Sequence, residues 1–83
     1  MSIQKVSIRQ VKAARALLGW SQHDLAAACG VSVPTVKRLE AGEGDLGGRI
    51  ETSVAIRAAL ESAGVVFIAE NGGGAGVRLR DRV

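Results

Sequence analysis

The sequence of 83 residues has few of the side chains that disulfide-rich, aromatic or membrane proteins depend on. It contains one Cys, one Pro, one Trp, one Phe and no Tyr. A single cysteine excludes an intramolecular disulfide framework, and no run of about 18 apolar residues indicates a membrane-spanning helix. The N-terminal residues do not have the pattern of a signal peptide. We therefore expect a protein of the reducing cytoplasm that does not enter a membrane.

Groups that carry catalysis or bind metals are also scarce. His23 is the only histidine, and neither a nucleophile nor a pair of carboxylates at a useful spacing accompanies it. Cys29 has no second cysteine or nearby histidine to complete a metal site. Residues 72–76 include four glycines, but neither a helix N-terminus nor a Lys-Ser/Thr pair follows, as a phosphate-binding loop requires. We expect no enzyme activity, metal or cofactor.

Aliphatic residues must therefore supply the core. Hydrophobic residues make up 47% of the chain, and only 2% of the chain is aromatic, so Leu, Val, Ile and Ala have to fill the interior. A chain of 83 residues suffices for one compact domain. A separate ligand-sensing domain is not expected.

Positive charge is concentrated in the N-terminal quarter. The formal net charge is +3, and residues 1–20 carry four bases and no acid. Lys5, Arg9 and Lys12 are spaced four and three residues apart, so on a helix they form one basic stripe. The stripe has two interpretations, a surface for phosphates or the solvated side of an amphipathic helix, and both can hold together.

Residues 22–40 have the pattern of two short helices joined by a three-residue turn. Ser21 is suited to cap the first helix, and Gly30 is suited to end it in the left-handed conformation. Ser32 and Pro34 then mark the start of the second helix. Two helices joined in this way are the outline of a helix-turn-helix that reads DNA.

The apolar residues of this pair fall on one side of each helix. Those expected on the inward face are Leu25, Cys29, Val31, Val36 and Leu39. Ala26 is small enough to let the two helices cross closely. The remaining, mostly polar residues are left to face outward.

Helical periodicity predicts two further helices around this pair. The first covers residues 7–18, and the other covers residues 51–63 with Thr52 or Ser53 as its cap. The intervening residues 43–49 include three glycines, so we expect a mobile loop there.

The C-terminal residues change in character. Residues 65–69 and 77–80 are β-type runs separated by a glycine-rich segment, which predicts a β-hairpin. An isolated hairpin is marginal in water, so this one must pack on the helices or pair with another chain, and dimerisation through its edge is one hypothesis. We expect two parts, a helix-turn-helix DNA-binding domain at residues 1–64 and the hairpin at residues 65–83 as a dimerisation or partner element.

The helix pair resembles the XRE family of lambda-repressor-like regulators. The positions that match the twenty-residue signature of that family are Gln22, Ala26, Gly30, Val36 and Leu39. The flanking residues 18–22 and 38–42 are similar to the family as well, and the resemblance covers residues 7–64. It implies a mainly α fold, a lambda-repressor-like helix-turn-helix bundle of about four helices, to which this chain adds its C-terminal β-hairpin.

The resemblance implies that the helix at about residues 33–41 enters the major groove of double-stranded DNA. Base contacts then fall on Val33, Pro34 and Arg38. Arg38 can donate two hydrogen bonds to a guanine; the alternatives are a salt bridge to an acid such as Glu40 or a phosphate contact. Val33 and Pro34 have no side-chain donors and can only pack on a group such as a thymine methyl, so specificity is expected to be modest.

Phosphate contacts are also implied by the resemblance. Gln22 lies where family members hydrogen-bond a phosphate, and Ser32, Thr35 and Lys37 are placed to do the same. Other roles stay open: Ser32 as a plain helix cap, Thr35 as a surface hydroxyl and Lys37 as a solvated charge. The loop at residues 43–49 is expected near the DNA backbone, as in the family.

These features predict a sequence-specific DNA-binding transcriptional regulator, with repression as the expected mode, that acts as a homodimer. Two alternatives remain open. The first is an antitoxin-like or phage-type repressor in which the hairpin also holds a protein partner. The second is a protein-interaction module that has kept the fold without DNA contact, as the modest net charge of +3 would allow.

Overall fold

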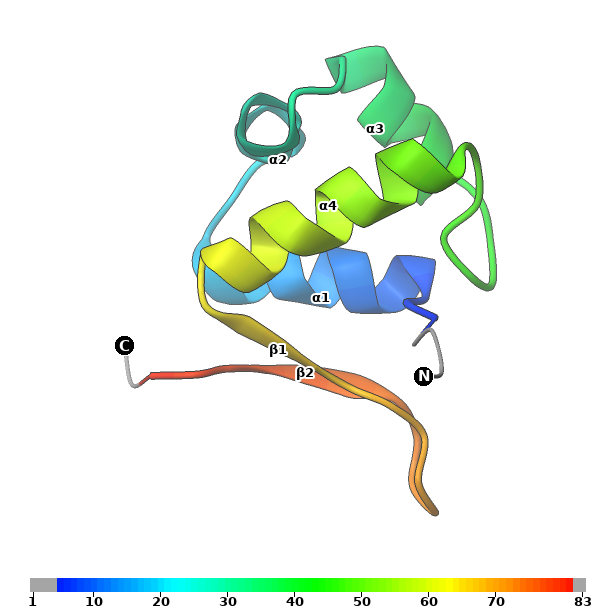
Figure 1. The fold of residues 1–83 in the computed structure, drawn as a ribbon, viewed down its shortest axis with the longest axis vertical. Helices are drawn as coiled ribbons and strands as arrows, with labels where there is room; N and C mark the ends of the chain where they lie inside the picture. The colour runs from blue at the N-terminus through cyan, green and yellow to red at the C-terminus, as the bar shows by residue number, and fades with distance from the viewer. Residues whose placement is uncertain (1–4, 82–83) are drawn as a thin grey trace.

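The computed structural model describes residues 5–81, which form four helices followed by a two-stranded antiparallel sheet (Figure 1). The elements in chain order are α1 (Ile8–Leu18), α2 (Gln22–Cys29), α3 (Val33–Glu40), α4 (Ile50–Ser62), β1 (Val65–Ile68) and β2 (Gly76–Leu79). The predicted helix-turn-helix bundle with a C-terminal hairpin is therefore confirmed. Within the described residues, no helix has the length and apolar character needed to cross a membrane.

Serine caps set the start of the first three helices. Ser7, Ser21 and Ser32 each accept a hydrogen bond from the backbone N–H of the residue three positions on. Gly19 and Gly30 follow α1 and α2 with φ of 69° and 74°, in the left-handed region that favours glycine. These local signals fix the three-residue turn between α2 and α3 where the sequence predicts it.

The start of α4 differs from the prediction. Its N-cap is Arg49, which makes no side-chain capping hydrogen bond, so the predicted caps Thr52 and Ser53 are wrong. Both lie inside the helix, where Ser53 Oγ donates to the carbonyl oxygen of Ile50 at 2.9 Å. A hydroxyl can bond back to a carbonyl of its own helix as readily as it caps an N-terminus, so residue type alone did not identify the boundary.

The core lies between the four helices and one face of the hairpin, and it is almost entirely aliphatic. Its largest fully buried side chains are Leu25, Ile56, Leu60, Val11 and Val36. Leu39 is buried as well, while Cys29 and Val31 are partly buried against the core, so the predicted inward face of α2 and α3 is confirmed. Trp20 covers the edge of the core from the turn between α1 and α2.

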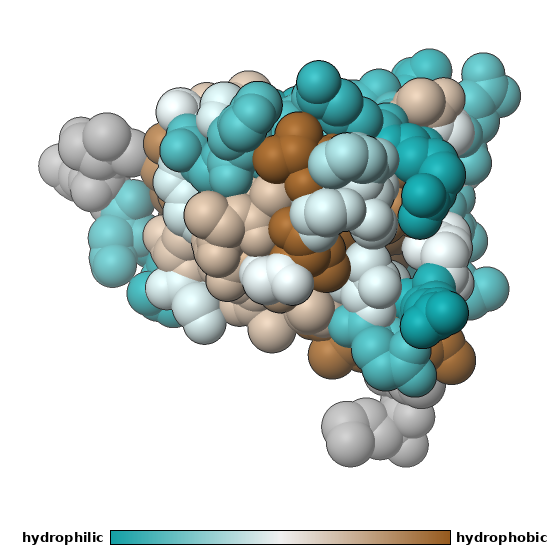
Figure 2. Space-filling model, turned by 90° about the horizontal axis from the view of Figure 1, so that it is seen from above, coloured by the Kyte–Doolittle hydropathy of each residue, from teal (hydrophilic) through white to brown (hydrophobic). Residues whose placement is uncertain are grey.

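Some apolar side chains remain at the surface. The exposed large ones are Leu17, Ile50, Val54 and Ile68. Alanines of α2 and α4 line a shallow groove, and Figure 2 shows apolar residues, in tan and brown, gathered on one side of the molecule.

The hairpin packs on the helices of its own chain. Val65 pairs with Leu79 and Phe67 with Val77, and all four side chains are buried in the core or packed against it. The two strands run beneath α1 and α4, which separate them from α3 (Figure 1). Of the two arrangements open to a marginal hairpin, the structure contains packing on its own helices.

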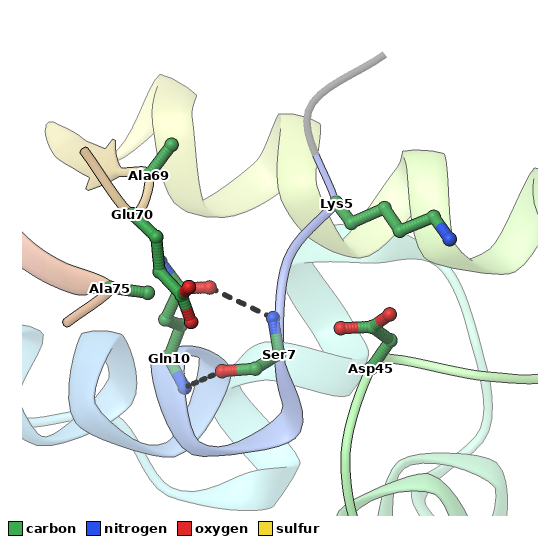
Figure 3. A pocket seen from close by; sticks show the side chains of 7 residues that line it. All are labelled: Lys5, Ser7, Gln10, Asp45, Ala69, Glu70 and Ala75. Carbon is green, nitrogen blue, oxygen red and sulfur yellow. Dashed lines mark hydrogen bonds between the residues drawn. The ribbon is translucent and has the colours of Figure 1, made fainter. Parts of the chain in front are cut away.

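Gln10 connects the start of α1 to the hairpin. This buried side chain donates from Nε2 to the carbonyl oxygens of Ile68, at 3.2 Å, and Gly76, at 2.9 Å. Its Oε1 accepts from the backbone N–H of Ser7 at 2.9 Å, beside the pocket drawn in Figure 3. One amide group therefore completes a helix cap and binds both strands at the end of the sheet.

We expect Gln10→Leu to lower the free energy of unfolding by about 1–2 kcal/mol, because two strand carbonyls lose their donor. Urea unfolding followed by circular dichroism measures the loss. Arg9→Leu, at the exposed neighbouring position of the same helix, is the matched control and should change stability by less than about 0.5 kcal/mol. Equal stability of the two variants would contradict the proposed role of Gln10.

The loop between α3 and α4 is anchored at its centre. Ile8 N–H donates to Gly44 and Leu46 N–H donates to Val6, both at 2.9 Å, and the Leu46 side chain packs on the core. We predicted a mobile loop at residues 43–49 from their glycine content. Glycine content gives no sign of the two backbone hydrogen bonds that anchor the loop. The partners of the loop are Val6, just before α1, and Ile8, the first residue of α1, so the contact joins distant parts of the sequence.

Candidate nucleic-acid interface

α2 and α3 form the helix-turn-helix at one side of the molecule, and the hairpin lies at the other (Figure 1). α3 packs on both α1 and α2, and α2 packs on α4. The side of α3 turned to the protein carries Val36, Leu39 and Glu40, which are all buried. The orientation of α3 is therefore fixed from within the domain.

The outward side of α3 carries the predicted base-contact residues. Pro34, Lys37 and Arg38 are exposed and lie three and four residues apart, so they share one face of the helix. Val33 is partly buried at the start of the same helix. The structure thus brings Val33, Pro34 and Arg38 together on one helix.

Arg38 makes no ion pair within residues 5–81. The alternative in which Arg38 pairs with Glu40 is not what the structure shows, because Glu40 is bound by Arg15 from α1. The guanidinium of Arg38 is exposed at the surface of α3. Its base contact stays a prediction.

Ser32 and Thr35 are engaged with each other at the start of α3. Ser32 Oγ accepts from the Thr35 N–H at 3.2 Å, and the two hydroxyl groups lie 2.8 Å apart in a second hydrogen bond. Ser32 is therefore a helix cap, which is the alternative role that the sequence analysis left open for it. The phosphate contacts of both residues stay predictions, and a phosphate would have to bind hydroxyls that already share a hydrogen bond.

Gln22 is joined to α3 by its side chain. Its Nε2 donates to Glu40 Oε1 at 3.1 Å. A carboxylate can only accept, so the amide nitrogen, not the oxygen, faces Glu40. One N–H of the amide remains for the predicted phosphate contact, which is untested.

The centre of this network is an ion pair between Arg15 and Glu40 that the sequence did not reveal. Arg15 Nε donates to Oε2 at 2.7 Å and Nη2 donates to Oε1 at 2.6 Å, a two-point contact. Arg15 Nη1 also donates to the carbonyl oxygen of Trp20 at 3.0 Å. The side chain of Glu40 is 4% exposed and that of Arg15 is 19% exposed. This cluster ties α1, the following turn, α2 and α3 together.

Burial by itself would raise the pKa of the Glu40 carboxyl. The hydrogen bonds from Arg15 and Gln22, with the positive charges of Arg15 and Lys12, outweigh burial and hold that pKa below its ordinary value. The hydrogen bond to Glu40 raises the pKa of the Arg15 guanidinium. Glu40 is therefore ionised at neutral pH and holds its two donors in place.

A signal for Arg15 was present in the helix pattern. Arg15 follows buried Ala14 by one residue and buried Val11 by four, so it lies at the border of the inward face of α1. When the N-terminal bases are only counted, Arg15 is equivalent to the exposed Arg9. Only the position on the helix separates them.

The predicted basic stripe on one helix is wrong in one member. Lys5 precedes Ser7, the N-cap of α1, and so does not belong to the helix. Arg9 and Lys12 lie on α1 and are exposed. The stripe was predicted from spacing alone, but the N-cap at which α1 begins lies between Lys5 and Arg9.

The remaining reactive side chains have structural surroundings. Cys29 is partly buried against the core, with Sγ 3.8 Å from the carbonyl oxygen of Ala26. His23 is exposed near the start of α2. No group of three His, Cys, Asp or Glu side chains that could hold a metal ion occurs in the part of the chain that the structure describes.

Comparison with protein families identifies residues 11–50 as helix-turn-helix. The matched residues include α2, α3 and most of α1. No curated protein matches the chain. Residues 11–50 thus form an XRE-type helix-turn-helix domain, as the resemblance predicted, and a domain of this kind implies DNA binding and is typically not an enzyme.

Proposed function

We propose that this protein is a sequence-specific transcriptional regulator that binds double-stranded DNA with α3 in the major groove. The observation that carries the proposal is the division of α3 into two faces. Val36, Leu39 and Glu40 fix one face to the domain, and Lys37 and Arg38 are exposed on the other. A helix held in this way can bring a guanidinium to the edge of a guanine.

We propose contacts of two kinds from this helix pair, to bases and to phosphates. Val33, Pro34 and Arg38 contact bases, with Arg38 as the polar reader and the other two as apolar contacts. The proposed phosphate contacts are Gln22, Ser32, Thr35 and Lys37. Phosphate contacts set the position of the protein on the duplex and base contacts set the preferred sequence.

We propose repression as the mode of action, because occupation of a promoter is sufficient to block transcription. The regulator would act in the cytoplasm as a homodimer without a cofactor. Its DNA-binding part would be residues 1–64, and residues 65–83 would be an accessory element. Symmetry of the operator tests the dimer, because a two-fold protein binds a palindrome.

Selection of DNA from a random pool by the purified full-length protein, at near-physiological salt, tests the function. A palindrome with half-sites about 10 base pairs apart would support a dimeric sequence-specific regulator. The proposal would be contradicted if no motif is enriched and the protein also shows no salt-dependent binding to DNA.

Lys37→Ala is expected to weaken binding to every duplex by a similar factor and to lower the slope of log K against log salt by about 1. The reason is that a phosphate contact carries no sequence information. Titrations of the selected duplex and an unrelated duplex at several salt concentrations measure both effects. A loss confined to the selected duplex would instead place Lys37 at a base.

The outer face of the hairpin supports a second candidate function, the binding of a protein partner. Ile68 is exposed and Val66 is only partly buried, and both lie on the side of β1 that faces away from the core. An antitoxin-like regulator or a protein-interaction module would use this face for a protein partner. Salt-dependent binding to DNA distinguishes the antitoxin-like regulator from the protein-interaction module, because a pure interaction module would show no such binding.

A further inference from the structure

Asn71 and Gly72 lie at the tip of the hairpin but do not form the turn in which such a pair usually occurs. In a two-residue hairpin turn, Asn-Gly is favoured because both residues adopt positive φ. Here residues 69–75 separate the two strands, and no residue other than glycine has a positive φ in the part of the chain that the structure describes. The conformation that usually accounts for Asn-Gly in a hairpin is therefore not the one that Asn71 adopts.

The tip of the hairpin, residues 69–75, is exposed along its whole length and extends past the helices (Figure 1). The side chain of Gln10 holds the end of the sheet at Ile68 and Gly76, on either side of the tip. Beyond that point, neither Asn71 nor Gly72 makes a hydrogen bond with another of the residues 5–81. A Cβ atom added to Gly72 would meet nothing within 4 Å. The backbone at residues 71 and 72 is thus free to rearrange.

We propose that Asn71 is a site of spontaneous deamidation, which converts its side-chain amide into a carboxylate. The backbone nitrogen of Gly72 loses its proton to solvent and attacks Cγ of Asn71. The bond from Cγ to Nδ2 breaks, ammonia leaves, and a cyclic succinimide remains. Water then opens this ring at one of its two carbonyl groups, which gives aspartate or isoaspartate at position 71. The reaction consumes one water molecule and releases one ammonia, and it involves no oxidation or reduction.

The structure of the tip favours ring closure. The reaction is intramolecular, so its rate depends on how readily the attacking nitrogen reaches Cγ. Gly72 has no Cβ to block that approach, and its φ of 104° lies in a region that glycine adopts at little cost. Since no hydrogen bond has to break first, the folded protein should react almost as fast as the unfolded chain. Asparagine at such a position limits the chemical lifetime of a protein.

The modification should change the charge of the hairpin without disturbing the core. The new carboxylate lies next to Glu70, and the formal net charge falls by one from +3. Isoaspartate also adds a methylene group to the backbone, but Gln10 holds both strands before the tip begins, so the register of β1 and β2 is retained. The hairpin is separated from α3 by α1 and α4, so the candidate nucleic-acid interface is not altered.

Incubation of the purified full chain in a mildly alkaline buffer, followed by mass spectrometry of the intact protein and its peptides, tests the inference. The mass should rise by the difference between an oxygen atom and an NH group. Asn71 is the only asparagine of the chain, so the added mass should lie in the peptide that contains it. The rate in buffer should be within about tenfold of the rate for the same chain unfolded in guanidinium chloride.

Two variants at the tip are matched controls. Asn71→Gln keeps an amide, but the extra methylene group requires a larger ring that forms more slowly, so the mass should stay constant. Gly72→Ala keeps Asn71 and should slow the reaction by about tenfold, because the new Cβ crowds the attacking nitrogen. Both positions are exposed, so both variants should fold, and circular dichroism checks this.

The inference is overturned if the mass does not change or if the added mass lies in another peptide. It is also overturned if the folded chain reacts more than about tenfold more slowly than the unfolded chain, because the fold then protects Asn71. None of these measurements involves DNA. Deamidation of a protein that binds no DNA would support the inference and refute the proposed function, and sequence-specific binding without any change in mass would do the reverse.

Discussion

Arg15→Met should lower the free energy of unfolding by about 3 kcal/mol at neutral pH. The substitution removes two hydrogen bonds from the carboxylate of Glu40, which is 4% exposed and keeps only its bond from Gln22. Removal of one partner from a buried ion pair is costly because the other charge stays buried without compensation. The carbonyl oxygen of Trp20 loses a donor as well.

The loss should depend on pH in a defined direction. Glu40 has a lowered pKa in the folded protein, so its ion pair stabilises the fold above the pKa of the unfolded state. That contribution disappears as the pH falls through the folded-state pKa. In Arg15→Met, burial prevails and raises the pKa of Glu40, so the carboxyl takes up a proton more readily. The difference from the wild type is therefore largest near neutral pH and shrinks below about pH 4.

Urea unfolding at several pH values measures this difference, with Arg9→Met as the matched control. Arg9 is an exposed arginine on the same helix, so its substitution should change stability by less than about 0.5 kcal/mol at any pH. The double variant Arg15→Met with Glu40→Leu removes the orphan charge and should be more stable than Arg15→Met alone. Equal losses in Arg15→Met and Arg9→Met would show that the ion pair contributes nothing.

The sequence predicted those features of the fold that are decided within a few residues. Ser21 with Gly30, and Ser32 with Pro34, mark the ends of the two helices because capping involves groups only three or four positions apart. The two β-type runs at residues 65–69 and 77–80, with a glycine-rich segment between them, likewise predicted the hairpin. A serine hydroxyl can cap a helix or bond a carbonyl inside it. At Ser53 it does the second, so the predicted cap was wrong.

The contacts that hold the candidate interface could not be predicted in this way. Arg15 and Glu40 are 25 residues apart, and Gln10 bonds Ile68 across 58 residues. Partners so distant in sequence are chosen by the packing of helices, which periodicity does not specify. The outward placement of Arg38 was predictable, since it follows from the inward placement of Val36 and Leu39 on the same short helix.

The second large effect is expected at Arg38. Arg38→Ala should weaken binding to the selected duplex by about 1–3 kcal/mol, or roughly 5- to 150-fold, and should relax the preference at one base position. The reason is the loss of two hydrogen bonds from a planar guanidinium to the N7 and O6 of one guanine. Titration of the selected duplex, and of duplexes with each guanine replaced in turn, identifies that position.

Arg38→Lys separates the geometry of this contact from its charge. Lysine keeps the positive charge and loses the planar pair of donors, so the variant should retain binding to unrelated DNA while it loses discrimination at the same base. The ion pair of Glu40 with Arg15 supports this role, because it binds the acid closest in sequence to Arg38 and leaves the exposed guanidinium for DNA. If Arg38→Ala weakens selected and unrelated duplexes by the same factor, Arg38 contacts a phosphate and sequence must be read by other residues.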